Sequence, residues 1–133
     1  MPNETHVPIT SASDIVAARQ KGRALAVNLG FESVDATLIA AAISEVSRNI
    51  VEYAKSGEII LQPSRNGSRA GLCIVARDRG PGIPDVARAL QYGYSTRRSL
   101  GVGLPGAKLL MDEFDIVSQV GLGTTITMKK WLR

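Results

Sequence analysis

The sequence predicts an α/β two-layer sandwich, in which a mixed, mostly antiparallel sheet is covered by helices on one face. Two segments in the first half of the chain carry apolar residues at helical spacing, and the later strand-like runs follow one another in pairs joined by short turns. Strands joined in hairpins pair antiparallel, so the helices have to share one face of the sheet. With 133 residues, 44% of them hydrophobic, we expect one domain spanning residues 1–133.

The first helix is predicted to follow a short edge strand at residues 7–10, where Pro8 is tolerated. Ser11 and Asp14 form a variant of the capping box, a hydroxyl followed three residues later by a carboxylate. Gly30 ends the helix in the usual C′ position. The apolar positions of this helix are Ile15, Ala18, Gly22, Leu25, Ala26 and Leu29.

A second helix is predicted to begin at Ser33, with Asp35 in its first turn favoured by the helix dipole, and to end at Gly57. Its apolar stripe is formed by Ile39, Ala42, Ile43, Val46, Ile50 and Tyr53. A polar row borders this stripe rather than opposing it, which favours the wall of a cleft. The row consists of Glu45, Asn49 and Glu52.

The second half of the chain is predicted to contain two hairpins separated by a loop and two helices. Strands at residues 58–62 and 71–77 are joined through Asn66-Gly67, the strongest hairpin signal in the chain. A polar segment flanked by glycines and without a clear period is a candidate lid. The remaining expected elements are a short helix at 85–90, the lid at 91–100, a helix at 103–114, and strands at 115–120 and 124–132.

Composition and charge argue against several classes of function. No apolar run approaches the ~20 residues of a membrane span and the polar N-terminus lacks the layout of a signal peptide, so we expect a cytoplasmic protein with no membrane partner. One cysteine and one histidine are too few for a zinc site. The net charge is +4 and the pI about 9.6, yet the basic residues are scattered and aromatic residues are few, so no nucleic-acid partner is expected. A bound polyphosphate or an acidic partner accounts for the charge equally well.

Glu45 and Asn49 lie one helical turn apart, so their side chains project side by side. A carboxylate can act as a general base or a metal ligand, and an amide oxygen is a neutral ligand suited to Mg²⁺. A solvated polar row is the alternative interpretation of this pair.

Asp78 stands where an apolar run, residues 72–76, gives way to a loop with two glycines and two prolines. Glycine permits a positive φ or a close approach to a ligand, and proline stiffens the turn. An ionised carboxylate is a pure acceptor, so it can take a hydrogen bond from the exocyclic amine of adenine, where guanine has a carbonyl. The motif could therefore select ATP over GTP, although ordinary turns share this composition.

Residues 101–106 have the pattern Gly-x-Gly-x-x-Gly at the start of a predicted helix. A Rossmann site needs a strand immediately before this pattern, and a Walker A loop needs a lysine where Ala107 stands, so the sequence predicts neither. Glycines at a helix N-terminus nevertheless expose backbone N–H groups and a positive dipole end to phosphate.

Taken together, these stretches resemble the motifs of the GHKL ATPases. Glu45-x-x-x-Asn49 resembles their N box. Three further stretches resemble their first, second and third glycine boxes in turn: Asp78-x-Gly80-x-Gly82, Gly101-x-Gly103 and Gly121-Leu122-Gly123-Thr124. Order and spacing agree, and the resemblance covers essentially the whole chain. The small size is similar to that of the bacterial anti-sigma and switch-kinase branch. Segments 14–20, 111–114 and 130–133 resemble in particular the serine/threonine switch kinases of the stressosome.

This resemblance implies a Bergerat ATP-binding fold in which Mg-ATP lies under the lid and its γ-phosphate passes directly to a protein hydroxyl. The implied acceptors are Ser or Thr residues of STAS-domain scaffold and antagonist proteins, and the released kinase would activate a PP2C-type phosphatase by binding it. Glu45 would orient or deprotonate the acceptor hydroxyl, and Asn49 would hold Mg²⁺. Arg97-Arg98 stands where small residues are expected, so these arginines contact either phosphate or only solvent. The implied nucleotide contacts are Asn49, Asp78, Gly80, Gly82, Ile83, Ser95, Thr96, Arg97, Gly101, Val102, Gly103, Leu104 and Thr124.

Other functions compete with this interpretation. An anti-sigma factor of the same fold would carry the same motifs and sequester a sigma factor, because partner surfaces are not encoded in the pocket motifs. Co-elution with a sigma factor or with a STAS protein separates these two functions, and an ionic-strength series tests the nucleic-acid alternative. A histidine-kinase fragment is disfavoured, because dimerisation helices and an acceptor histidine are not evident and His6 lies in the N-terminal tail.

Overall fold

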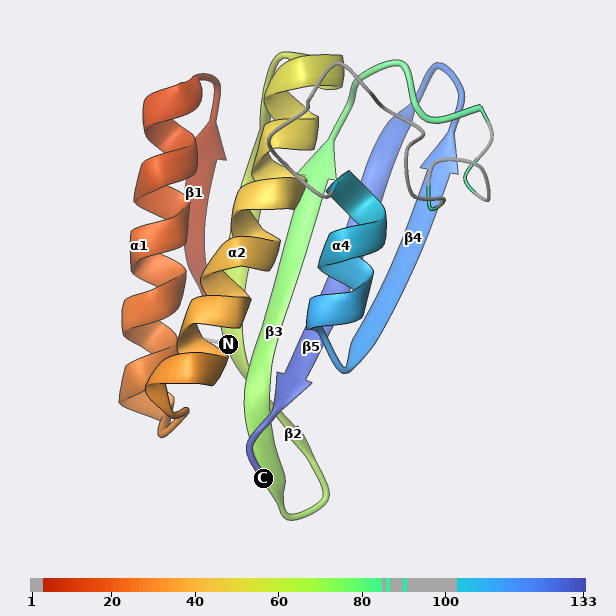
Figure 1. Cartoon of the computed structure of the whole chain (residues 1–133). Helices are drawn as coiled ribbons and strands as arrows, with labels where there is room; N and C mark the ends of the chain where they lie inside the picture. Colours follow the sequence, from red (N-terminus) through yellow and green to blue (C-terminus); the bar gives the residue numbers. More distant parts are fainter. Residues whose placement is uncertain (1–3, 85, 87–89, 91–102) are drawn as a thin grey trace.

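The computed structural model describes residues 4–84, 86, 90 and 103–133. Its elements follow the order β1, α1, α2, η1, β2, β3, α4, β4, β5 (Figure 1). The predicted short helix at 85–90 lies outside the described residues except at positions 86 and 90, and the predicted lid at 91–100 lies entirely outside them. No helix within the described residues is long and apolar enough to cross a membrane.

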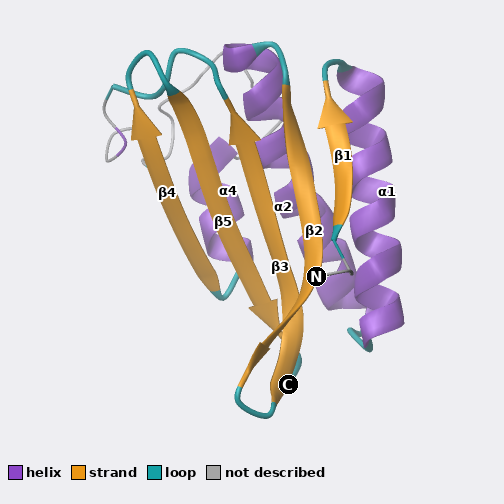
Figure 2. Ribbon diagram, turned by 180° about the vertical axis from the view of Figure 1, so that it is seen from behind, coloured by secondary structure: helices purple, strands orange, loops and turns teal. Residues whose placement is uncertain are grey.

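The five described strands form one sheet in the order β1-β2-β3-β5-β4, and each neighbouring pair is antiparallel. Helices α1, α2 and α4 cover one face of this sheet, and none of the described helices lies on the other face, as Figure 2 shows from behind; we call this second face the helix-free face. The predicted two-layer fold class is confirmed. The strands are β1 (Thr5–Ile9), β2 (Gly57–Asn66), β3 (Arg69–Asp78), β4 (Glu113–Gln119) and β5 (Gly123–Trp131).

Helix α1 (Ala12–Leu29) begins after Ser11, but the Ser11 side chain does not cap it. Instead, the Asp14 carboxylate accepts hydrogen bonds from the Thr10 backbone N–H at 2.8 Å and the Thr10 hydroxyl at 2.9 Å. The predicted capping box is therefore wrong in its serine half, because the aspartate ties the helix to the preceding residue. At the other end Gly30 has φ 107°, which confirms the predicted left-handed stop.

Helix α2 (Ser33–Asn49) continues into one π-helical turn, η1 (Ile50–Ala54), closed by a 2.9 Å bond from the Lys55 N–H to the Ile50 carbonyl. The apolar stripe predicted for this helix is buried from Ile39 to Ile50. Tyr53, predicted to continue it, is 41% exposed. The wider turn adds a residue per hydrogen bond and so rotates the positions after Ile50 away from the α-helical stripe.

The core lies between the helices and the covered face of the sheet. A Cβ on Gly22 of α1 would collide with Ile43 of α2, so this glycine lets the two helices approach closely. The largest fully buried side chains come from both layers: Ile9, Ile39, Ile43, Val46, Ile50, Ile59, Leu61, Leu72, Ile74, Ile126 and Met128.

Two boundaries in the second half differ from those predicted. Strand β2 continues through Pro63 to Asn66, which pairs with Arg69, so the loop is Gly67-Ser68. Proline is tolerated there because β1 pairs with β2 only as far as Leu61, which leaves the later part of β2 at an edge. Helix α4 (Gly103–Leu110) ends four residues before the predicted end.

The end of α4 is stabilised by a side chain from β5. The Lys130 ammonium donates to the Leu110 carbonyl at 2.9 Å, which satisfies one of the helix's terminal acceptors. Phe114, predicted as the last helical residue, belongs instead to β4 and packs against the core.

Candidate functional site

The described motif residues gather at one end of the molecule. Strand β3 ends there at Asp78, α2 passes into its π turn there, and the β4–β5 turn lies at the same end (Figure 1). The row of cross-strand neighbours at this end of the sheet runs Gly57, Asp78, Thr124 and Ser118, one residue from each of β2, β3, β5 and β4. Ile59 and Leu61 of β2 are buried in the core beneath the helices, and Gly57 shares their face by alternation, so this row faces the helices.

Asp78 is the last residue of β3, as its position after an apolar run predicted. Its Oδ1 accepts a 2.8 Å hydrogen bond from the Gly80 N–H, so the loop itself fixes the orientation of the carboxylate. Its Oδ2 accepts no hydrogen bond from the described residues. The carboxylate can therefore offer this second oxygen to a ligand.

The two glycines of the loop are required by close approach to other parts of the chain. A Cβ on Gly80 would collide with Ala54 of η1, and one on Gly82 would collide with the Gln119 carbonyl. Gly82 also has φ 81°, where a side chain is strained. The loop thus fits between the π turn and the β4–β5 turn.

Ser118 joins this loop to the sheet. Its Oγ accepts a 2.7 Å hydrogen bond from the Ile83 N–H and lies 2.8 Å from the Thr124 hydroxyl and 3.3 Å from the Gly123 carbonyl. A further bond, 2.8 Å long, runs from the Gly121 N–H to the Pro81 carbonyl. Sequence reasoning missed Ser118; the available signal was a polar residue in the inward row of β4 after Phe114 and Ile116.

Glu45 lies on the last turns of α2, and its side chain is 13% exposed. Its Oε1 accepts a 3.1 Å hydrogen bond from the Gly103 N–H at the start of α4 and lies 3.0 Å from the Arg48 guanidinium. The same Arg48 nitrogen is buried, and apart from this ion pair it makes no hydrogen bond to the described residues. A carboxylate thus occupies the anion-binding end of α4.

The remaining predicted site residues divide into two groups. Asn49 is the last residue of α2, one turn after Glu45, and Leu104 is buried in the core beside Gly103. No hydrogen bond among the described residues joins Asp78 to Glu45 or Asn49. Five predicted contacts lie outside the described residues: Ser95, Thr96, Arg97, Gly101 and Val102.

A metal ion at this end could not be held by a cluster of charged or histidine and cysteine side chains from the described residues alone. In the described part of the chain, no group of three or more His, Cys, Asp or Glu residues could hold a metal ion. The donor type at Asn49, an amide oxygen, fits Mg²⁺, which commonly takes one or two protein ligands with substrate phosphates and water.

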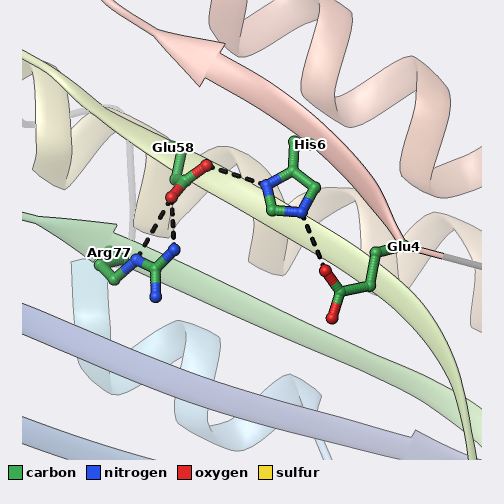
Figure 3. Close-up of polar contacts among 4 residues, drawn as sticks. All are labelled: Glu4, His6, Glu58 and Arg77. Atoms are coloured by element: carbon green, nitrogen blue, oxygen red, sulfur yellow. Dashed lines mark hydrogen bonds and ion pairs between the residues drawn. The ribbon is translucent and has the colours of Figure 1, made fainter. Parts of the chain in front are cut away.

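A second polar cluster lies on the helix-free face of the sheet (Figure 3), opposite the face that carries this site and one register pair from Asp78. Glu58 accepts a short hydrogen bond from Arg77, 2.6 Å, and lies 3.0 Å from one His6 ring nitrogen; the other ring nitrogen lies 2.9 Å from Glu4. The hydrogen bonds from Arg77 and His6 lower the pKa of Glu58, and those to Glu58 and Glu4 raise the pKa of His6.

Comparison with known proteins gives consistent matches. The model of the family described as Histidine kinase-like ATPase domain matches residues 9–130. The serine/threonine-protein kinase RsbT of Bacillus subtilis (strain 168) is 49% identical over 133 residues, the full length of both chains. Anti-sigma F factors are more distant: that of Geobacillus stearothermophilus is 29% identical, covering 98% of this chain and 93% of its own, and that of Anoxybacillus flavithermus is 31% identical, covering 99% and 94%.

Proposed function

The chain belongs to the histidine kinase-like ATPase family, and we propose that it is a single-domain serine/threonine protein kinase that transfers the γ-phosphate of Mg-ATP to a protein hydroxyl. The observation that carries this proposal is the 49% identity to the kinase RsbT over the full length of both chains. The positions of Asp78, Glu45 and Gly103 at one end of the molecule support it, because they suit a hydrogen-bond acceptor for adenine, a general base and a backbone N–H for phosphate.

Asp78 is proposed to recognise the base. Its Oδ1 is already held by the Gly80 N–H, so Oδ2 can accept the hydrogen bond of the adenine amine without any change of rotamer. Guanine would present a carbonyl oxygen to the same carboxylate, and two acceptors repel. The short loop from Gly80 to Ile83 forms the surroundings of this contact.

The start of α4 and the end of α2 are proposed to receive the phosphates. The Gly103 N–H stands at a helix N-terminus, where the dipole and free N–H groups favour an anion. Asn49 would hold Mg²⁺, which when bound neutralises phosphate charge. Ser95, Thr96, Arg97, Gly101 and Val102 are proposed as further phosphate contacts from the sequence alone.

Glu45 is proposed to act on the acceptor hydroxyl. In the transfer, the bond between the γ-phosphorus and the bridging oxygen breaks, a bond to the acceptor oxygen forms, and the hydroxyl proton passes to the Glu45 carboxylate. The carboxylate bonds to the Gly103 N–H in this structure. A phosphate that accepts the Gly103 N–H in place of Glu45 would free the carboxylate for the acceptor hydroxyl. Nucleotide binding would therefore prepare Glu45 to act as the general base.

The proposed acceptors are Ser or Thr residues on STAS-domain scaffold and antagonist proteins, and the proposed second partner is a PP2C-type phosphatase that the released kinase activates. To test this, the purified protein is mixed with Mg²⁺, γ-labelled ATP and the STAS-domain proteins of the same genome. We expect label on a Ser or Thr of at least one of them. Label on none of them, with ATP bound, would contradict the proposal.

Anti-sigma activity is the second candidate, because anti-sigma F factors match nearly the whole chain at 29–31% identity. Such a protein would retain a sigma factor on a column. Co-elution of the purified chain with a sigma factor, and not with a STAS protein, would favour this alternative.

A further inference from the structure

The hydroxyl of Ser118 sits between two residues assigned to the nucleotide, and neither the family motifs nor the proposed roles include it. It accepts the Ile83 N–H at 2.7 Å and lies 2.8 Å from the Thr124 hydroxyl. We propose that Ser118 is a positioning residue that fixes the loop at the adenine-binding end of the site and thereby the placement of Asp78 against the base. This inference rests on the proposed nucleotide site but not on the identity of the phosphate acceptor.

The first part of the argument concerns the loop after Asp78. This loop contains positions where a side chain would collide with other segments, so it is placed by contacts at both of its ends. At the start, the Gly80 N–H bonds to Asp78; at the end, the Ile83 N–H bonds to Ser118 on a different strand. Removal of the Ser118 hydroxyl leaves the second attachment without its acceptor.

The second part concerns proton direction. A serine hydroxyl has one proton and two lone pairs, and the Ile83 N–H, which can only donate, takes one lone pair. The Ser118 proton then goes either to Thr124 at 2.8 Å or to the Gly123 carbonyl at 3.3 Å. All three contacts are hydrogen bonds at once only when the Ser118 proton goes to the Gly123 carbonyl and Thr124 donates to the second Ser118 lone pair, so the hydroxyl ties the loop to both β4 and β5.

This attachment has a consequence for the recognition of adenine. Thr124 is the cross-strand neighbour of Asp78, so their side chains share one face of the sheet at adjacent positions. The loop that Ser118 holds also carries the Gly80 N–H that orients the Asp78 carboxylate, so the attachment fixes the acceptor for the adenine amine. Guanine presents a carbonyl oxygen to the same carboxylate and gains nothing from that placement. Ser118 would therefore contribute to the choice of base as well as to affinity.

The test compares ATP and GTP affinities by calorimetry and competition for the wild type, Ser118→Ala and Ser118→Thr. We expect Ser118→Ala to weaken ATP binding by roughly tenfold, the effect of about one lost hydrogen bond, to leave GTP binding nearly unchanged, and to raise KM for ATP without a comparable fall in kcat. Ser118→Thr, which retains the hydroxyl, should restore most of the preference for ATP.

Ser44→Ala is the matched control, because it removes another buried serine hydroxyl, one that bonds to the Ala40 carbonyl within α2. Its ATP-to-GTP affinity ratio should equal that of the wild type. An unchanged ratio in Ser118→Ala, or equal losses for both nucleotides, would overturn the inference even if the protein melts at a lower temperature. Because binding is measured, a wild type that binds ATP but phosphorylates no protein would contradict the kinase proposal and leave this comparison decisive.

Discussion

The two ends of the proposed nucleotide site, a base end at Asp78 and a phosphate end at Gly103, differ in what their polar groups do before a ligand arrives. At the base end, Asp78 bonds to Gly80, and Ser118 bonds to Ile83, through contacts that leave the second Asp78 oxygen available. At the phosphate end, the Gly103 donor is already taken by the Glu45 carboxylate. The base end is preorganised, whereas the phosphate end is occupied by the protein's own anion.

This difference arises from the elements that carry the polar groups. The base end is built on paired strands and a short loop, so its side chains are placed by the register of the sheet. The phosphate end joins two helices through residues 58 apart in sequence. A preorganised contact contributes affinity. At the phosphate end, a phosphate that replaces Glu45 at the Gly103 N–H would release the Glu45 carboxylate, so phosphate binding is coupled to release of the proposed general base.

The largest effect is expected for Glu45→Ala at the phosphate end. Loss of a general base typically lowers a rate by about 10²–10⁴-fold, so phosphate transfer should fall by that order while ATP still binds. Single-turnover transfer with γ-labelled ATP measures it. Asp115→Asn, an exposed carboxylate on β4, is the control and should retain full activity. Near-normal transfer by Glu45→Ala would remove it from the catalytic step.

A smaller effect is expected for Asp78→Asn at the base end. One charge-assisted hydrogen bond is lost, about 1.5–3 kcal/mol, so ATP affinity should fall by roughly ten- to 150-fold, with little change for GTP. Calorimetry gives both values directly. Unchanged ATP affinity in this variant would show that the base is bound elsewhere.

Asn49→Ala tests whether the phosphate end also holds the metal ion. An amide that holds Mg²⁺ should matter only when the metal is present, so ATP binding should weaken by about three- to tenfold with Mg²⁺ and not with a chelator. Paired titrations in the two conditions supply the comparison. If the loss is the same with and without Mg²⁺, then Asn49 contacts the nucleotide rather than the metal.

The smallest effect is expected on the helix-free face, at His6. Its raised pKa means that its pairing stabilises the fold fully below the ordinary value of 6.5 and that this contribution is lost as pH rises through the raised pKa. The lowered pKa of Glu58 gives stability that is present above 4.5 and lost as pH falls through the lowered pKa. The cluster should therefore contribute most between about 4.5 and 6.5.

We expect only a small change in melting temperature, because these pairs are exposed to solvent. His6→Gln should abolish the part of the pH dependence that lies above 6.5 and leave phosphate transfer unchanged. A loss of transfer in His6→Gln would mean that this face is coupled to the site. Melting curves measured from pH 5 to pH 9 provide the comparison.

The sequence predicted the features that depend on local pattern. Helical spacing identified the buried stripe from Ile39 to Ile50, Gly30 marked the end of α1, and the apolar run placed Asp78 at the end of a strand. These features follow from side-chain periodicity and from glycine's conformational freedom, which a single sequence displays.

Features set by distant contacts were not predicted. The π turn after which Tyr53 is exposed and the lysine that bonds to the last carbonyl of α4 depend on packing between elements. Ser118 acquires its role only because the β4–β5 register places it opposite Thr124. The Glu45–Gly103 bond likewise requires the packing of α4 against α2, so the sequence placed both residues in the site without indicating that they bond to each other.

The contrast between the two ends is tested most directly by titrating adenosine and ADP, without Mg²⁺, into the wild type and Glu45→Ala. Adenosine reaches only the base end, so we predict equal affinity for both proteins. ADP must displace the carboxylate from the Gly103 N–H, so we predict tighter binding to Glu45→Ala by several-fold, and the gain should persist at high salt because it arises from a direct contact. Equal ADP affinities for the two proteins, or a gain that disappears with salt, would contradict the claim that Glu45 occupies the phosphate's place.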